Sequence, residues 1–149
     1  MKKILFIITL LIAFTAAESN AQFRQNTFLA GAGIGLGTSD KVFPLGGQLE
    51  WGVTPKLGIG YIGVGVMGGI NFVSGGSNIW LGAHGSYHFD IQSIPQLDLF
   101  VGLGLAVTDG ASSLGLQGGA RYFFSRNLAV FLKGGDGWYR GFIGIDFSL

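Results

Sequence analysis

The chain lacks cysteine and has little charge. With no cysteine among its 149 residues, it forms no disulfides and carries no lipid-anchored cysteine. Charged residues make up 11% of the sequence, whereas an average soluble domain has about 25%. The 9 basic and 8 acidic side chains nearly cancel. A balanced, sparsely charged surface gives no reason to expect nucleic acid or another polyanion as a partner.

Long apolar runs are also lacking, except at the start. A basic pair, Lys2-Lys3, precedes an apolar run over residues 4–14 and then small residues up to Ala21. This order predicts a secretory signal peptide over residues 1–21, cleaved after Ala21, and one mature domain over 22–149. The alternative is a membrane-spanning helix, but the run is shorter than the roughly 20 apolar residues that a span needs.

What the mature chain has in abundance is glycine and apolar side chains. Glycine accounts for 28 residues, and 48% of the sequence is hydrophobic. Beyond the first segment, no stretch resembles a membrane-spanning helix. An exported apolar chain without apolar helices is typical of a β-barrel in an outer membrane. A soluble barrel would need a charged outer surface, and the sequence has too few charges to supply one.

A period-two alternation of apolar with small or polar residues runs through most of the chain, which is the pattern of half-buried strands. It predicts an all-β fold, an eight-stranded antiparallel up-and-down transmembrane β-barrel. Within one stretch the alternation changes parity, which predicts a β-bulge near Tyr61. The expected strands cover residues 27–36, 45–53, 57–72, 79–89, 97–107, 114–124, 128–133 and 141–149.

The two faces of these strands differ in charge. The apolar face carries none, so we expect it to face lipid, and the glycine-rich face to line a narrow lumen. Aromatic residues of the apolar face gather where the strands meet one rim, as in an interfacial girdle. These are Phe28, Trp51, Tyr87, Phe89, Tyr122, Phe124 and Phe147. The lumen face carries the charges Glu50, Asp98, Arg121, Lys133 and Asp146.

Three of the lumen charges stand at similar heights in the expected barrel. Glu50, Arg121 and Asp146 each lie near the end of an even-numbered strand. An arginine between carboxylates satisfies charges that cannot stay unpaired in a dry interior, and Lys133 adds a fourth structural lumen charge. The alternative is a gate whose ion pairs rearrange to open a narrow solute or ion pore. We favour the structural interpretation, because eight strands leave little lumen.

The closing strand carries a resemblance to a known family. Gly144, Phe147 and Leu149 stand at matching positions of its terminal strand, and residues 118–124 are similar to its sixth strand. The mature chain as a whole resembles the small OmpA/OmpX-type outer-membrane β-barrels. The family usually has a polar residue in place of Phe142 and often ends in Phe. The resemblance implies that Gly144, Phe147 and Leu149 form the assembly signal read by the barrel-assembly machinery, and that lipid and lipopolysaccharide surround the barrel.

Catalytic and cofactor motifs are weak. His84 and Ser86 form a His-x-Ser pair like that of outer-membrane lipid A deacylases, with Asp98 the near carboxylate that could orient the histidine. The alternation turns this pair toward the lumen, away from lipid, so we expect no enzyme. A metal site at His84 and His88 lacks an evident third ligand. The glycines of residues 63–68 match a dinucleotide-binding spacing but lie within a strand. We therefore expect no cofactor.

The outer loops are short and rich in Gly, Ser and Asp, and only Trp138 and Tyr139 look like contact residues. The sequence therefore predicts a small monomeric outer-membrane protein with a structural or interaction role and no catalytic activity. A lipid A-modifying hydrolase using His84 and Ser86, and a narrow pore, remain as alternatives.

Overall fold

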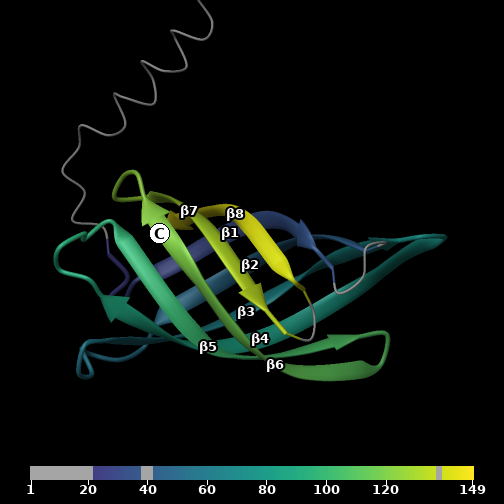
Figure 1. Cartoon of the computed structure of the whole chain (residues 1–149), viewed down its shortest axis with the longest axis horizontal. Helices are drawn as coiled ribbons and strands as arrows, with labels where there is room; N and C mark the ends of the chain where they lie inside the picture. The colour runs from purple at the N-terminus through teal and green to yellow at the C-terminus, as the bar shows by residue number, and fades with distance from the viewer. Residues whose placement is uncertain (1–21, 38–41, 137–138) are drawn as a thin grey trace, which may run out of the picture.

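The computed structural model describes residues 22–37, 42–136 and 139–149, which form a closed antiparallel β-barrel (Figure 1). The expected signal peptide lies outside this range. Each strand pairs with its neighbours in sequence, so the predicted eight-stranded up-and-down topology is confirmed. No helix in the described part of the chain is long and apolar enough to cross a membrane. The strands are β1 (Phe28–Leu36), β2 (Phe43–Gly52), β3 (Gly60–Val73), β4 (Gly76–Asp90), β5 (Leu97–Thr108), β6 (Ala111–Phe123), β7 (Leu128–Gly135) and β8 (Gly141–Ser148).

The first and last strands close the barrel. β8 pairs with β1 from Leu29 opposite Ser148 to Leu36 opposite Gly141. Leu149 continues this contact, since its amide donates to the carbonyl of Phe28 at 2.9 Å. Pairing the last strand with the first removes the free edges that would otherwise recruit other chains. Both ends of the described chain lie at one end of the barrel, called here the terminus end.

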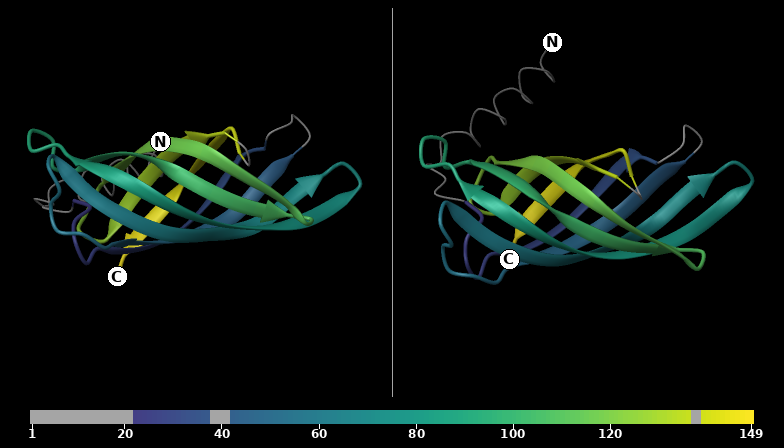
Figure 2. Two further views of the ribbon diagram at one scale, coloured as in Figure 1. Left: turned by 90° about the horizontal axis from the view of Figure 1, so that it is seen from below. Right: turned by 60° about the horizontal axis from the view of Figure 1, so that its bottom comes forward.

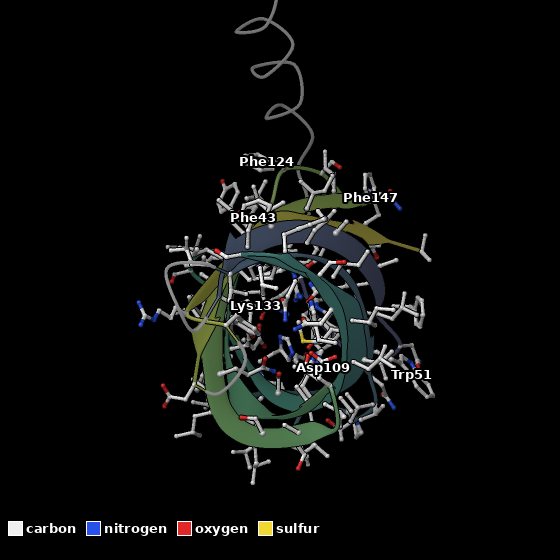
Figure 3. All side chains as sticks on the ribbon, turned by 90° about the vertical axis from the view of Figure 1, so that its right-hand side faces the viewer. Phe43, Trp51, Asp109, Phe124, Lys133 and Phe147 are labelled. Carbon is white, nitrogen blue, oxygen red and sulfur yellow. The ribbon has the colours of Figure 1, made fainter. Side chains whose placement is uncertain are left out.

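The strands present an apolar outer face and a polar inner one, as the alternation predicts. Leu81 is 65% exposed and Leu114 72%, whereas Arg121 and Asp146 are 1% and 0% exposed. Figure 3, which looks into the barrel from the end opposite the termini, shows Trp51, Phe124 and Phe147 projecting outward. Such an inside-out distribution suits a surface surrounded by hydrocarbon.

Two turns at the end opposite the termini, those after β3 and β5, are tighter than the sequence predicts. Asp109 and Gly110 alone connect β5 to β6, with φ angles of 46° and 79°. Two consecutive positive φ values form the hairpin turn that matches strand twist, which explains an Asp-Gly pair here. The β3–β4 hairpin turns at Ser74 and Gly75 and reaches furthest from the barrel (Figure 2). We call the end of the barrel opposite the termini the hairpin end.

The predicted bulge near Tyr61 is wrong. β3 begins only at Gly60 and pairs without interruption with both β2 and β4. The residues before it form a tight turn, in which Leu57 bridges to Gly60 and Gly58 has a φ of 62°. The alternation changes parity because Leu57 and Ile59 belong to this turn and not to the strand.

Candidate functional site: the filled lumen

A single arginine holds three carboxylates together inside the barrel. Arg121 on β6 donates from Nε to Asp146, from one terminal nitrogen to Asp98 and from the other to Glu50, each at 2.7 Å. All four side chains are at most 3% exposed. The planar guanidinium fork offers fixed donor directions, and here each edge meets a carboxylate from a different strand.

The backbone pairing explains how these groups meet. Asp98 of β5 lies directly opposite Arg121 of β6 in the ladder, so their contact is local. Glu50 and Asp146 reach Arg121 across the lumen, so their side chains need space beside the inner surface of the strands. Inward-facing glycines provide this space because they have no side chain. A Cβ atom at Gly31 would lie 1.9 Å from Asp146 Oδ1, and one at Gly65 would lie 2.6 Å from the ring of His84.

A histidine links two of the carboxylates from the other side. Nδ1 of His88 lies 2.9 Å from Asp98 Oδ1, and its Nε2 lies 3.1 Å from Glu50 Oε1. Both ring nitrogens face acceptors, so the contacts are complete only when both carry hydrogen. The imidazolium together with Arg121 and Lys133 then balances the three carboxylates. In that protonation state the cluster holds equal numbers of positive and negative groups.

The His-x-Ser pair is placed inside this lumen. His84 and Ser86 are 7% and 3% exposed, and both point inward from β4. Nε2 of His84 lies 3.4 Å from Glu50 Oε1. The hydroxyl of Ser86 accepts from Nε2 of Gln117 at 3.2 Å. Each side chain is engaged with a different partner, so the pair does not form the nucleophile–base contact that hydrolysis needs.

Lys133 joins the charged cluster to an aromatic one. Its ammonium donates to Oε1 of Gln48, and Nε2 of Gln48 donates to Asp146 at 2.8 Å. The same ammonium lies 5.5 Å from the ring centroid of Phe131 and 5.8 Å from that of Phe142. A cation above aromatic faces is stabilised when water is excluded.

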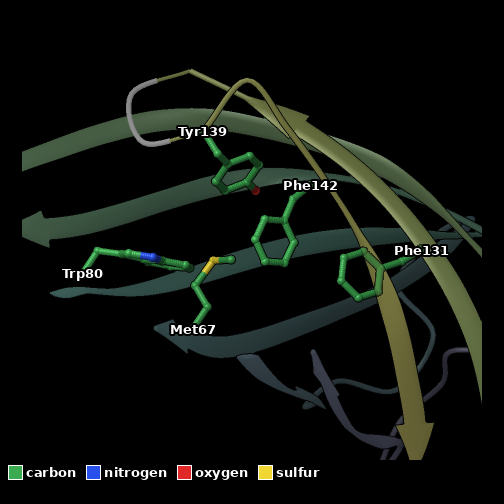
Figure 4. Close-up of a cluster of buried hydrophobic side chains, with 5 residues drawn as sticks. All are labelled: Met67, Trp80, Phe131, Tyr139 and Phe142. Atoms are coloured by element: carbon green, nitrogen blue, oxygen red, sulfur yellow. The ribbon is translucent and has the colours of Figure 1, made fainter. Parts of the chain in front are cut away.

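The aromatic layer fills the lumen toward the hairpin end (Figure 4). It consists of Met67, Trp80, Phe131, Tyr139 and Phe142. Tyr139 is 2% exposed and donates to Oε1 of Gln117 at 2.9 Å. The expectation that Tyr139 is a surface contact residue is therefore wrong, because its loop folds the ring into the barrel. Trp138, the other expected contact, lies outside the described residues.

A third element, which the sequence analysis did not predict, closes the terminus end. The ring of Phe23, ahead of β1, stacks on His88 with centroids 3.7 Å apart and planes 15° apart. Phe23 is 1% exposed, and the guanidinium of Arg121 lies 5.9 Å above its ring. Next to it, Gln22 donates to Asp90 at 2.6 Å. The segment before the barrel thus acts as a plug, which we call the Phe23 plug.

The structure brings Glu50, Arg121 and Asp146 into direct contact. Lys133 is connected to them through Gln48, which donates to Asp146. Sequence reasoning put Asp98 on the lumen face but missed the part that Asp98 and His88 play in the cluster. It missed Phe23 entirely, because that residue lies in no strand. Within the described residues, no group of three or more His, Cys, Asp or Glu side chains has the arrangement of a metal site.

Comparisons with known proteins rest on the fold. No protein-family model and no curated protein sequence matches the chain. A designed transmembrane β-barrel matches with a TM-score of 0.72 and 22% identity, over 86% of this chain and 99% of the design. The N-terminal β-barrel domain of Pseudomonas aeruginosa OprF matches with a TM-score of 0.59 and 17% identity, over 84% and 98%. Yersinia pestis outer membrane protein Ail, solved in a phospholipid bilayer nanodisc, matches with a TM-score of 0.58 and 10% identity, over 84% and 100%. The fold is that of the small outer-membrane β-barrels of the OmpA/OmpX type.

Proposed function

We propose that the protein is a small, non-enzymatic outer-membrane barrel with a permanently filled lumen, serving as a structural or interaction protein. The observation that carries this proposal is the inversion of charge. Glu50, Asp98, Arg121, Lys133 and Asp146, five of the six Asp, Glu, Lys and Arg residues within the described strands, are buried in the lumen, and the sixth, Asp90, lies at the rim. Arg121 holds three of them in a buried cluster. An apolar outer wall around a polar interior is stable in hydrocarbon and unfavourable in water.

Location is tested first. The expected signal peptide over residues 1–21 would export the chain, and a folded barrel should migrate differently on a gel before and after boiling. We expect the native protein in the outer-membrane fraction, extractable only with detergent. Recovery as a soluble periplasmic monomer would overturn the proposal.

Assembly is the second part of the proposal. Gly144, Phe147 and Leu149 would form the terminal signal for the barrel-assembly machinery, and β8 must also pair with β1 to close the barrel. We expect Phe147→Asp, and deletion of the last two residues, to leave unfolded protein in the periplasm. Phe147→Leu keeps an apolar outward side chain and serves as the matched control. Normal insertion of Phe147→Asp would show that the signal lies elsewhere.

The pore alternative predicts a conducting lumen. Along the barrel, the Phe23 plug, the Arg121 cluster and the aromatic layer follow one another, and all three consist of buried side chains. We therefore expect no channel events in planar bilayers containing the wild-type protein. Discrete conductance steps, increased by Arg121→Ala, would favour a gated pore over a closed barrel.

The hydrolase alternative predicts that Ser86 meets a lipid substrate. Ser86 is 3% exposed, bonded to Gln117 and turned away from the outer wall. Purified protein should leave lipid A unchanged, and Ser86→Ala should match wild type in folding and membrane lipid profile. Release of acyl chains by wild type but not by Ser86→Ala would establish an enzyme.

A further inference from the structure

A cavity of about 290 Å³ lies in the mouth of the barrel at the hairpin end. It is separate from the Arg121 cluster, because the aromatic layer lies between them. Its polar lining comes from the ends of β3 and β5 and the starts of β4 and β6. Barrel mouths are recurrent sites for small ligands, and this volume is at the lower end of their usual range. The lining side chains that matter here are Asn71, Asn78, Trp80, Thr108, Ser112 and Ser113.

The polar groups of this mouth cavity are all neutral, since its lining contains no Asp, Glu, Lys or Arg. Asn71 and Asn78 are direct neighbours across the β3–β4 ladder, which places two amides side by side. Oδ1 of Asn78 is buried and has no hydrogen-bond partner among the described residues. The amides and hydroxyls of the lining offer both donors and acceptors, which suits a neutral ligand that carries hydroxyl or amide groups.

The floor of the cavity is an aromatic ring held in place from below. Trp80 is 4% exposed, and its indole extends from β4 toward β2, where a Cβ at Gly46 would lie 2.7 Å from its Cζ2. Phe142 packs edge-on against it, with centroids 6.4 Å apart. An indole surface bordered by neutral amides and hydroxyls suits a molecule with apolar C–H faces and a rim of hydroxyls.

We propose that the mouth cavity binds one uncharged sugar unit, either a free sugar or a residue of a surface glycan. The proposal assigns a ligand class to the interaction role proposed above. It rests on that proposed function in one respect, namely that the hairpin end of the barrel faces outward. A single sugar ring has few non-hydrogen atoms, so we expect a dissociation constant in the millimolar range.

The test measures binding to the full-length mature protein in zwitterionic micelles, because detergents with sugar headgroups would compete. Saturation-transfer NMR with glucose, galactose, mannose and N-acetylglucosamine should show contact for at least one of them. Asn78→Ala should weaken it at least tenfold, and Ala106→Phe, which fills the cavity, should abolish it. Asn127→Ala, in a turn at the terminus end, is the matched control and should bind as wild type. Glucuronate and glucosamine should bind more weakly than their neutral counterparts.

Each variant must first pass the boiling-dependent gel shift, and Ser113→Ala replaces Asn78→Ala if that variant does not fold. The inference is overturned if neither neutral monosaccharides nor neutral oligosaccharides bind, if binding survives Ala106→Phe, or if charged sugars bind as well. Binding of monosaccharides assigns a soluble sugar as the source, and binding of oligosaccharides alone assigns a surface glycan. Since the measurement is made in micelles, its outcome does not depend on where the protein resides in the cell.

Discussion

The two filled regions of the lumen are stabilised in opposite ways. Around Arg121, charged groups from five strands are removed from water and compensate one another at hydrogen-bond distance. Toward the hairpin end, Trp80, Phe131 and Phe142 fill the same bore by ring packing, with Phe131 and Phe142 stacked at 6.0 Å. The charged region depends on every partner being present, whereas the aromatic region tolerates replacement by another apolar side chain of similar volume.

The largest effect is expected at Arg121. Arg121→Met leaves Glu50, Asp98 and Asp146 buried without their shared cation, so the free energy of unfolding should fall by about 3–5 kcal/mol. Urea unfolding in micelles measures this, with Arg126→Met in the exposed β6–β7 turn as control. Neutralising the stranded groups in Arg121→Met/Glu50→Gln/Asp98→Asn should recover most of the loss. A triple variant as unstable as Arg121→Met would show that charge compensation is not what the arginine supplies.

Phe142→Leu tests the aromatic region and should cost about 1.5 kcal/mol, because a smaller apolar side chain leaves a partly filled space. The same urea titration applies, with Phe124→Leu on the outer face as the size-matched control. When Phe142→Leu is combined with Glu50→Gln, the two losses in the free energy of unfolding should add, since the two regions use different interactions. Strong coupling between them would mean that charged and aromatic regions form one cooperative unit.

Phe23→Leu tests the plug and should have a smaller effect. The change keeps apolar volume but removes the ring stacked on His88, a contact worth about 1 kcal/mol. Local undocking of the segment should then become roughly fivefold more frequent. Trypsin cleavage after Arg24 measures this rate, and cleavage after Arg126 in the same molecule is the internal control. Equal rates at Arg24 in both proteins would mean that the plug is not held by the stack.

The smallest effect is expected at the rim of the terminus end, where Lys56 donates to Asp90. This hydrogen bond raises the pKa of Lys56 above its usual 10.5 and lowers the pKa of Asp90 below 3.8. The pair's small contribution to the free energy of unfolding should thus be fully present between pH 3.8 and pH 10.5. It should disappear as pH falls through the lowered pKa of Asp90, or rises through the raised pKa of Lys56. Lys56→Gln should leave the unfolding midpoint at pH 7 almost unchanged, because the ammonium is exposed. A clear shift at pH 7 would show that this exposed pair is structurally important.

The fold was accessible from the sequence because a strand's alternation directly determines which side chains share a face. Leu99 and Asp98 are assigned correctly to outside and inside by that rule alone. Contacts across the lumen were less accessible. That Arg121 meets Glu50, or that His88 spans two carboxylates, depends on strand stagger around the whole barrel, which no local pattern encodes.

Segments without alternation were predicted least well. Phe23 and Tyr139 enter the lumen from irregular chain, and neither has a neighbouring pattern that indicates burial. The parity change before Gly60 was assigned to a bulge because a tight turn containing Gly58 and a strand defect leave the same trace in the alternation.

The Arg121 cluster also bears on how the barrel folds. Its carboxylates come from β2, β5 and β8. Asp98 and Asp146 lie one and two strands away from Arg121, whereas Glu50 on β2 lies four strands away in either direction and meets the arginine only when the sheet curls into the closed barrel. Before the barrel closes, Arg121 and its carboxylates would be incompletely paired, and they would be exposed to water or to hydrocarbon. We therefore expect closure to complete the charge compensation and partly assembled barrels to be unstable. We expect the slow event to be the meeting of β1 and β8, the two strands furthest apart in sequence.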